Sequence, residues 1–517
     1  MSISAAGLTI RDNSLVSGTV SFDRIHLSTR SVEADPVARL LHSTVELVEF
    51  SVPEATRGVD MPANLLVMKD LEVKDKAALR DTPVQIELSQ TLAVDEVIFP
   101  VTHDGQFYRV VGESVVEDSG QTVVNIRELP SGTSADGDTI LDEGEKSRSL
   151  GNALKLAFFK LALGVNDINK LCWNEFLEDG EVTRHTEGVA ERVAKADKVL
   201  ILIHGIIGST HDMSTGIAAA VTPDKKPLQE AYDLVLSYDY ENLNTSISDT
   251  GLAFKKALLE AGLHRNDEKD VTILAHSMGG LVSRWMIEQE QGHELVDRLI
   301  LAGTPNHGSN FGKIESARSF AVVVLDLALN FIPSMVPFAA TALKILKAPT
   351  QVLVTLGEME PSSDFIKQLN ASKDPGVPYF IVGGNALKFE IDETAGKFAR
   401  FMEQATLKIG DLVNPGEPHD IAVELDSVFN RTTPGWSARQ PAPLMLEPAC
   451  HHLNYFHSDE GMEALIEIGL GGYSASGTVV EEKDPEPAEG TAALIEKVEK
   501  LQLRDRFVAW LRKIFKV

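Results

Sequence analysis

The chain has 517 residues, which is enough for roughly three structural units at about 150 residues each. Its composition, with 43% hydrophobic and 24% charged residues, is that of a globular protein and excludes global disorder or a fibrous repeat. The net charge of −28 repels phosphate backbones, so we expect no nucleic acid partner.

The N-terminus and the cysteines predict the compartment. The opening MSISAAGLTIRDNSL lacks the basic and then apolar pattern of a secretory signal, and Cys172 and Cys450 are the only cysteines. We therefore expect a cytoplasmic protein without structural disulfides.

A separate β-rich domain is expected over residues 1–140. Three short runs with β propensity alternate there with turn signals: 96–101, 107–112 and 122–129. Residues 141–195 are expected to be a linker and helical connector, with a helix over 147–164. The β-rich domain could bind an unknown partner and deliver the rest of the protein to it.

From 196 to 473 the pattern changes to strands and helices in alternation. The expected strands are short and almost wholly apolar: 199–203, 233–238, 271–275, 298–302 and 379–383. Strands without polar alternation are buried on both faces, and strand–helix alternation gives a parallel sheet covered by helices. We expect a doubly wound α/β domain with its ligand site beyond the carboxyl ends of the strands.

A candidate nucleophile follows the third of these strands. Residues 271–288 read as a buried strand, a tight turn and an amphipathic helix, with Ser277 at the turn. A serine in this position adopts a strained backbone, so small residues are needed two positions before and after it, here Ala275 and Gly279. A helix N-cap would also explain Ser277, but the whole context favours a nucleophile.

The segment 204-HGIIGST-210 follows the first strand and predicts an oxyanion hole. A chain that turns sharply at Gly205 can aim the N–H of Ile206 at a developing oxyanion, with the N–H of Met278 as the second donor. We expect His204 to brace this loop. A glycine-rich turn without a ligand is the alternative.

A serine nucleophile needs an imidazole as base and a carboxylate that holds the correct tautomer of that imidazole. A serine at a turn of this kind is followed along the chain first by the acid and then by the histidine. His451 or His452 fits best, in the loop after an expected last strand at 443–447, whereas we expect His457 to be a surface loop residue. Three carboxylates are candidates for the acid: Asp411, Asp420 and Asp426. Asp420, which lies in a loop after the strand at 379–383, is preferred, but the residue pattern alone would not choose it, because a single Asp in a loop is usually solvated.

Six segments carry a family resemblance: 203-IHGIIGS-209, 274-LAHSMGG-280, 301-LAGTPNHGS-309, 359-MEPSSDFIKQLN-370, 420-DIAVELDS-427 and 450-CHHLNYF-456. Together they resemble the bacterial lipase and esterase branch of the α/β-hydrolases, including hydrolases near the GPI-inositol deacylase-like proteins. The resemblance implies an α/β-hydrolase fold with a mostly parallel, doubly wound sheet. It covers residues 199 to about 470 and says nothing of the first 140 residues.

The resemblance also points to the acid and the base. In such families the Asp of D-x-x-V-x-x-x-S is the acid, which implies Asp420, and the His of H-x-x-Y-F is the base, which implies His452. The chain departs from the family pattern in its doubled His451-His452 and in a long insertion at 386–410. His451 therefore remains the alternative base.

A helical lid insertion is expected at 307–370. Residues 327–343 in it carry no charge over seventeen positions, but a membrane span needs about 20 apolar residues, and Pro333 and Pro337 interrupt this stretch. The functional interpretation is a mobile cap whose apolar inner face binds acyl chains, and a buried helix pair is the alternative.

The C-terminal sequence predicts an acidic linker at 474–490 and a basic amphipathic helix within 491–517. Over 503–517 an apolar stripe at helical spacing is accompanied by five positive charges and the single acidic residue Asp505. Such a helix suits an anionic membrane surface and would make the protein peripheral to a membrane. Packing of the helix on its own acidic domain is the alternative.

The expected activity is hydrolysis of a carboxylic ester, in particular of a lipid, through an acyl-enzyme on Ser277. In this expectation His452 acts as base and then as acid, and no metal or cofactor is implied. A thioesterase or an acyltransferase would use the same triad and is the close alternative. A membrane-tethered interaction protein built on an inactive hydrolase scaffold is the alternative from another class.

Overall fold

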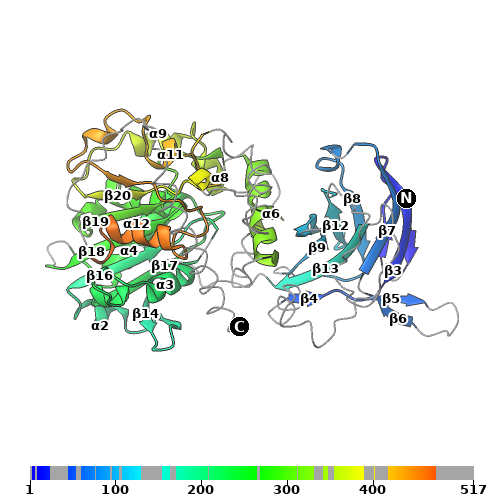
Figure 1. The fold of residues 1–517 in the computed structure, drawn as a ribbon, viewed down its shortest axis with the longest axis horizontal. Helices are drawn as coiled ribbons and strands as arrows, with labels where there is room; N and C mark the ends of the chain where they lie inside the picture. Colours follow the sequence, from blue (N-terminus) through cyan, green and yellow to red (C-terminus); the bar gives the residue numbers. More distant parts are fainter. Residues whose placement is uncertain are drawn as a thin grey trace, which may run out of the picture. The chain divides into compact units, whose positions relative to one another are not determined.

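A computed structural model gives the fold (Figure 1). It describes residues 3–5, 8–23, 45–53, 60–129, 154–162, 170–330, 342–346, 354–388, 401 and 417–472, with short gaps at 64, 76, 94–95, 104–106, 208, 265–267 and 311–312. Residues 1–473 form one compact unit. The acidic linker expected at 474–490 and the basic helix expected within 491–517 lie outside the described residues.

An eight-stranded sheet forms the second half of this unit, and the fold is α/β. Its strand order is β15-β14-β17-β16-β18-β19-β20-β21. The strands are β14 Lys170–Phe176, β15 Val182–His185, β16 Lys198–Ile203, β17 Leu234–Asp239, β18 Asp270–His276, β19 Arg298–Ala302, β20 Tyr379–Val382 and β21 Leu444–Leu446. All pairs from β17 to β21 are parallel, whereas β14 pairs antiparallel with β17 and β15. The strands expected from 199 to 447 are therefore confirmed.

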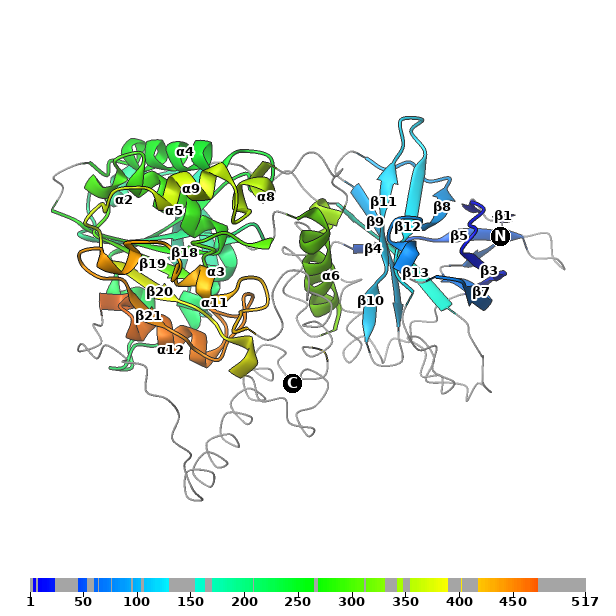
Figure 2. The same cartoon turned by 90° about the horizontal axis from the view of Figure 1, so that it is seen from above.

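Helices cover both faces of this sheet. They are α2 Val189–Val193, α3 Thr210–Ala219, α4 Ile247–Glu260, α5 Met278–Glu288, α11 Leu425–Val428 and α12 Asp459–Glu467. In β16, Val199, Ile201 and Ile203 join the core under α4 and α5, while Leu200 and Leu202 join the core under α3 and α12. Figure 2 shows α4 and α12 on opposite sides of the sheet. Burial on both faces explains why the strands are apolar throughout.

The N-terminal strands form two antiparallel sheets, β1-β2-β8-β12-β11 and β10-β9-β13-β7-β3, with β4 paired to β13 and a separate β5-β6 pair. The strands are β1 Ile3–Ala5, β2 Leu8–Ile10, β3 Val16–Asp23, β4 Val45–Leu47, β5 Phe50–Pro53, β6 Asp60–Ala63, β7 Leu65–Val73, β8 Val84–Leu88, β9 Glu96–His103, β10 Tyr108–Val110, β11 Gly112–Val116, β12 Thr122–Ile126 and β13 Leu154–Ala162. Side chains from both sheets, such as Ile86, Val124 and Leu156, form a common core. The strands expected at 96–101, 107–112 and 122–129 are present.

The helix expected over 147–164 is wrong, because Leu154–Ala162 form β13, which pairs with β9, β7 and β4. Its side chains alternate between two cores: Leu154, Leu156 and Phe158 enter the core of the N-terminal sheets, and Ala157, Phe159 and Leu161 enter the core that continues into the α/β part. A strand buried on both faces is apolar throughout, and periodicity alone cannot distinguish it from a buried helix.

In the described part of the insertion between β19 and β20 lie α6 Ile314–Asn330, α8 Val354–Met359 and α9 Asp364–Asn370, and residues 342–346 are also helical. A buried ion pair joins α6 to β10, because Arg109 Nη1 lies 3.1 Å from Asp326 Oδ2 and the N–H of Val110 donates to Asp326 Oδ1 at 2.8 Å. Residues 331–341 of the uncharged stretch lie outside the described residues. Among the helices that the structure describes, none is long and apolar enough to cross a membrane.

Candidate active site

Ser277 stands at the sharp turn between β18 and α5. Its φ of 54° and ψ of −128° are strained for a residue with a Cβ atom. Its side chain makes no capping hydrogen bond to α5, whereas Ser209 and Ser246 accept such bonds at the starts of α3 and α4. The N-cap explanation of Ser277 therefore does not hold.

Glycines after Ser277 allow this turn to pack closely. A Cβ atom on Gly279 would lie 2.3 Å from the carbonyl oxygen of His204, and one on Gly280 would lie 2.0 Å from Thr304 Oγ1. Both distances are far below van der Waals contact, so larger residues would push the nucleophile turn away from the neighbouring strands. The small residue at position 279 is required by this close approach.

Ser277, His452 and Asp420 form a continuous chain of hydrogen bonds. Ser277 Oγ lies 2.9 Å from His452 Nε2, and His452 Nδ1 lies 2.7 Å from Asp420 Oδ2. Ser277 and His452 are each 3% exposed, and Asp420 is fully buried. Burial alone would raise the pKa of Asp420, but its hydrogen bonds and the charge of His452 outweigh this effect and hold that pKa below its usual value.

The loop after β20 explains the D-x-x-V-x-x-x-S pattern. The N–H groups of Ala422 and Val423 donate to Asp420 Oδ1 at 3.0 and 2.8 Å, and Ser427 Oγ donates to the carbonyl oxygen of Gly308 at 2.5 Å. Ile421, which lies between Asp420 and Ala422 in the chain, adopts a φ of 75°, which is unusual for a β-branched residue. The carboxylate is thus held in place by the backbone turn that contains it.

Two other buried histidines of the loops around Asp420 and His452, namely His451 and His419, contact different partners. His451 Nδ1 accepts from the N–H of Leu453 at 3.2 Å, and burial lowers the pKa of His451 to about 4. His419 Nδ1 accepts from the N–H of Ile421 at 2.9 Å. Of His451 and His452, the structure places His452 against Ser277.

The three remaining expectations concern His457 and the alternative acids Asp426 and Asp411. His457 lies in the loop after β21 with its side chain partly exposed, and its Nε2 lies 2.7 Å from Asp212 Oδ1 on α3. Asp426 is exposed and pairs with Arg431 at 3.1 Å, so it does not face His452. Asp411 lies outside the described residues.

The loop after β16 lies directly against the nucleophile. A Cβ atom on Gly205 would lie 2.5 Å from Ser277 Cβ and 3.1 Å from Ser277 Oγ. The next residue, Ile206, is anchored by its carbonyl oxygen, which accepts from Asn242 Nδ2 at 2.7 Å. Met278 is the first residue of α5, and N–H groups at that position have no partner within a helix. Both amides expected at the oxyanion hole thus come from segments that border Ser277.

His204 braces this loop. Its ring stacks on Tyr240 with centroids 4.5 Å apart, its Nδ1 lies 2.7 Å from the carbonyl oxygen of Gly205, and Tyr240 Oη donates to the carbonyl oxygen of His204 at 2.7 Å. Burial lowers the pKa of His204, which favours the neutral ring.

Sequence reasoning missed three residues that contact the base or the acid. His276 Nε2 lies 2.9 Å from the carbonyl oxygen of His452, and burial followed by the charge of His452 lowers the pKa of His276 to about 3, so the neutral ring donates there. The ring of Phe320, from α6, lies edge-on to the His452 ring at 6.1 Å. Tyr455 Oη donates to Asp420 Oδ2 at 2.8 Å. Tyr455 was named within the H-x-x-Y-F motif, but without a role.

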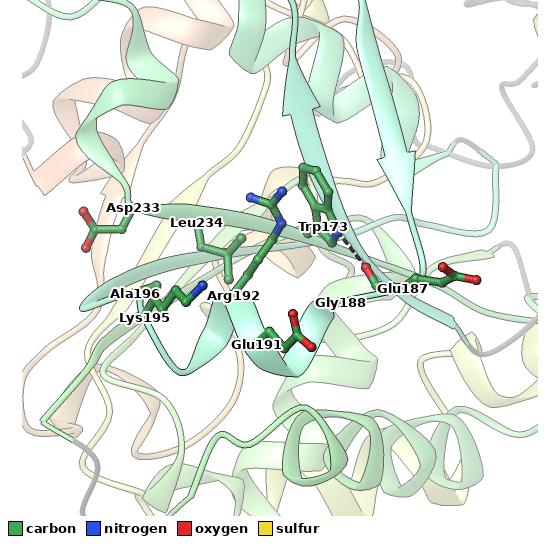
Figure 3. A pocket seen from close by; sticks show the side chains of 9 residues that line it. All are labelled: Trp173, Glu187, Gly188, Glu191, Arg192, Lys195, Ala196, Asp233 and Leu234. Carbon is green, nitrogen blue, oxygen red and sulfur yellow. Dashed lines mark hydrogen bonds between the residues drawn. The ribbon is translucent and has the colours of Figure 1, made fainter.

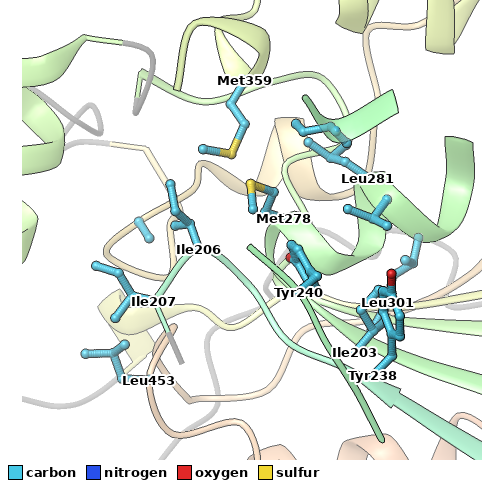
Figure 4. Close-up of a cluster of buried hydrophobic side chains, with 14 of the residues drawn as sticks. Ile203, Ile206, Ile207, Tyr238, Tyr240, Met278, Leu281, Leu301, Met359 and Leu453 are labelled. Carbon is cyan, nitrogen blue, oxygen red and sulfur yellow. The ribbon is translucent and has the colours of Figure 1, made fainter. Parts of the chain in front are cut away.

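Figure 4 shows apolar side chains of the large buried core, which includes residues next to Ser277 and His452 in the chain. They belong to one buried cluster and come from the loop after β16, the start of α5, the end of α8 and the loop after β21: Ile206, Ile207, Met278, Met359 and Leu453. Met278 and Leu453, which follow Ser277 and His452 in the chain, therefore belong to this apolar core, whereas His276 and Tyr455 make polar contacts with the base and the acid.

A cavity of about 610 Å³ lies elsewhere, lined by residues from β14, α2 and the start of β17 (Figure 3). It adjoins Leu234 at the start of β17, whereas Ser277 follows the end of the nearby parallel strand β18. The Trp173 ring in the cavity wall is covered by two side chains. Arg192 Cζ lies 3.3 Å from the centroid of this ring, and the His185 ring stacks on it with centroids 4.1 Å apart. Within the described part of the chain, no group of three or more His, Cys, Asp or Glu side chains could hold a metal ion.

Solved structures of low sequence identity match part of this chain. No curated protein matches it. The lipase BlEst2 of Bacillus licheniformis in its mature form is 17% identical, with 51% of this chain and 86% of that chain covered and a TM-score of 0.30. The phospholipase PlaB of Legionella pneumophila is 15% identical, with 45% of each chain covered and a TM-score of 0.29. The NocB thioesterase domain is 12% identical, with 52% of this chain and 92% of that chain covered and a TM-score of 0.29.

A family model described as a domain of unknown function, DUF7379, matches residues 164–470, which is more than half of the chain. The matched span contains the whole eight-stranded sheet. It also contains all three members of the hydrogen-bonded chain: Ser277, Asp420 and His452. The protein therefore belongs to the DUF7379 family.

Proposed function

We propose that this protein is a serine hydrolase of the α/β-hydrolase type that cleaves carboxylic esters. The observation that carries this proposal is the chain of hydrogen bonds from Ser277 Oγ through the His452 ring to the Asp420 carboxylate. A hydroxyl, an imidazole and a buried carboxylate in this sequence are the parts that nucleophilic acyl transfer requires.

The topology supports the hydrolase type. Ser277 follows β18, Asp420 follows β20 and His452 follows β21, so all three lie beyond the carboxyl ends of parallel strands. The strained turn at Ser277 and the order serine, acid, histidine match the nucleophile elbow of this fold.

The proposed reaction has two halves. Ser277 Oγ attacks the ester carbonyl carbon while its proton passes to His452 Nε2, and Asp420 stabilises the resulting imidazolium. The N–H groups of Ile206 and Met278 hold the oxyanion of the tetrahedral intermediate. His452 then gives its proton to the oxygen of the leaving alcohol. The alcohol departs, and the acyl group remains bound to Ser277 Oγ as an acyl-enzyme.

Water completes the cycle. His452 takes a proton from a water molecule, the water oxygen attacks the acyl carbon, and the Ser277 oxygen leaves with that proton. The products are a carboxylic acid, an alcohol and the unchanged enzyme. No step needs a group beyond these residues and water.

The surroundings support a substrate with an apolar acyl chain. Met278 and Leu453, which follow Ser277 and His452 in the chain, belong to a buried apolar core, and pockets that bind hydrophobic ligands are lined by such side chains. Phe320 brings α6 against the His452 ring, and we propose that the insertion around α6 is the cap of this site. Attachment to an anionic membrane through 503–517 would bring such a site to lipid substrates and remains a proposal from the sequence.

Labelling with a fluorophosphonate probe tests this function. We expect one covalent adduct on Ser277, located by mass spectrometry of peptides, and turnover of p-nitrophenyl esters of increasing chain length. Ser277→Ala should abolish labelling and lower kcat by at least about 10³-fold, because the nucleophile is lost.

His452→Ala and His451→Ala form a matched pair of adjacent buried histidines. The first should lose activity like the serine variant, because His452 Nε2 lies 2.9 Å from Ser277 Oγ, and the second should retain most of it, because His451 Nδ1 accepts from the N–H of Leu453 instead. A folded wild-type protein that neither reacts with the probe nor cleaves any ester of the panel would refute the proposal. Turnover near the wild-type rate in Ser277→Ala would refute it too.

A further inference from the structure

A buried phenol lies between the proposed triad acid and the end of β20. Tyr455 is fully buried, and its Oη donates to Asp420 Oδ2 at 2.8 Å and accepts from the N–H of Gly384 at 2.6 Å. It follows His452 by three positions in the loop after β21. The same oxygen Oδ2 also lies 2.7 Å from His452 Nδ1, so Tyr455 and the base share one carboxylate oxygen.

The direction of these hydrogen bonds is fixed by the chemistry of the groups. The main-chain N–H of Gly384 can only donate, so the phenol oxygen must accept there. Its single proton is then available for Asp420. Burial and then the charge of Asp420 raise the pKa of Tyr455 well above its usual value, so the phenol keeps this proton.

Glycines at two strand ends make room for the phenol. Gly303, after β19, has φ +59°, and a Cβ atom there would lie 2.8 Å from Asp420 Oδ2 and 2.9 Å from Tyr455 Oη. A Cβ atom on Gly384 would lie 2.6 Å from the carbonyl oxygen of Cys450. The ends of β19 and β20 therefore close around Tyr455 and Asp420, and side chains at these glycines would separate them.

Asp420 thereby receives four hydrogen bonds, two on each oxygen. The N–H groups of Ala422 and Val423 bind Oδ1, and Tyr455 and His452 bind Oδ2. Donors on both oxygens fix the plane of the carboxylate. The donor on Oδ2 also draws negative charge away from the point at which the carboxylate meets the imidazole.

We propose that Tyr455 is a positioning residue that orients the Asp420 carboxylate and limits how strongly it holds the proton of His452. This role rests on the proposed function of Ser277, His452 and Asp420. Without the phenol hydroxyl, the charge on Asp420 Oδ2 is less dispersed and stabilises the imidazolium more strongly. His452 then loses its proton only at a higher pH, and less of the enzyme has a free base at neutral pH.

Tyr455→Phe tests the proposal, and Tyr379→Phe is its matched control. Tyr379 is also a buried tyrosine whose Oη donates to a buried carboxylate, Glu288 Oε1 at 2.9 Å, but it stands at the start of β20, whereas the triad lies beyond the carboxyl ends of the strands. We expect Tyr455→Phe to lower kcat about tenfold, equivalent to about 1.4 kcal/mol, with KM little changed. The acid limb of its kcat/KM profile should move to higher pH, and the profile of Tyr379→Phe should match the wild type.

A second readout does not depend on turnover. The His452 Nδ1 proton in the hydrogen bond to Asp420 can be followed by proton NMR of the wild-type chain and both variants as pH is changed. We expect the titration midpoint of this resonance to rise in Tyr455→Phe and to stay unchanged in Tyr379→Phe. A midpoint and a pH profile that both match the wild type in Tyr455→Phe would overturn the proposal, and so would an equal shift in the two variants.

This pair of readouts separates the two hypotheses. If no ester is cleaved and Ser277 is not labelled, but the midpoint rises in Tyr455→Phe, the positioning role stands and the proposed function fails. If Tyr455→Phe does not fold, 3-fluorotyrosine at position 455 replaces it, since its phenol is a stronger donor of nearly the same size. The midpoint should then fall, and a midpoint that rises or does not move would overturn the proposal.

Discussion

Gly205→Ala tests whether the loop after β16 sets the geometry of the nucleophile. The new Cβ atom would lie 2.5 Å from Ser277 Cβ, 3.1 Å from Ser277 Oγ and 3.2 Å from the carbonyl oxygen of His276. Carbon atoms are in contact at about 3.5 Å, so the loop and the nucleophile turn must separate by up to about 1 Å. Ser277 Cβ is fixed by its main chain, so no side-chain rotation relieves the overlap.

The expected cost follows from the oxyanion hole. Ile206 follows Gly205 directly, so its N–H moves with the loop. Loss of one oxyanion donor lowers kcat by about 10²- to 10³-fold, and a displacement of about 1 Å costs about 10²-fold. We expect a fall in kcat of this size with KM little changed, together with an overpacking cost of about 1–3 kcal/mol in stability.

Gly357→Ala is the matched control. Gly357 is exposed in α8, and no atom lies within 4 Å of its added Cβ. Alanine should stabilise that helix by about 0.5–1 kcal/mol and leave kcat unchanged. Initial rates with p-nitrophenyl acetate and thermal unfolding would be measured for both variants. A Gly205→Ala protein with kcat within about threefold of wild type would show that the loop does not hold an oxyanion donor against Ser277.

Three further predictions concern parts outside the triad. Asp326→Asn breaks the buried ion pair between α6 and β10 and should lower the free energy of unfolding in urea by about 3–5 kcal/mol. The exposed Asp426→Asn should lower it by only about 0–1 kcal/mol, and equal losses in the two variants would contradict the role of burial. Burial alone would lower the pKa of His457, but the charge of Asp212 raises this pKa above its usual value of 6.5. Asp212→Asn should therefore lower the melting temperature most below about pH 6.5, and this loss should vanish as pH rises through the raised pKa. A loss that grew with pH would have the wrong sign. Removal of 491–517 should abolish co-sedimentation with anionic liposomes and spare turnover of a short-chain ester, and unchanged liposome binding would refute the anchor.

Much of the α/β part could be predicted from the sequence, because its signals are local. Strands buried on both faces are apolar throughout, so the runs that became β16 to β20 stood out from the helical stretches between them. The turn at Ser277 was also recognisable, since a strand, small residues and an amphipathic helix are contiguous in the chain. Such features need no knowledge of distant residues.

The same apolar signal failed at β13. Its two faces enter different cores, so no polar side of a strand or helix marks the element, and only its pairing with β7 and β9 shows that it is a strand. The contact of His457 with Asp212 could not be predicted from the sequence either, because the two residues are 245 positions apart. Pairings across such distances leave no trace in a short window of sequence.

The acid and the base required contacts between remote loops. A carboxylate in a loop has no local signature, and the motif resemblance was needed to prefer Asp420 over Asp411 and Asp426. In the structure Asp420 faces the His452 ring, and the N–H of His452 donates to the carbonyl oxygen of Asp420 at 2.8 Å. His451 and His452 are adjacent, so composition and spacing treat them alike, but their rings lie in different surroundings. The tertiary structure distinguishes them because only one of the two rings can lie between a serine 175 residues away and an aspartate 32 residues away.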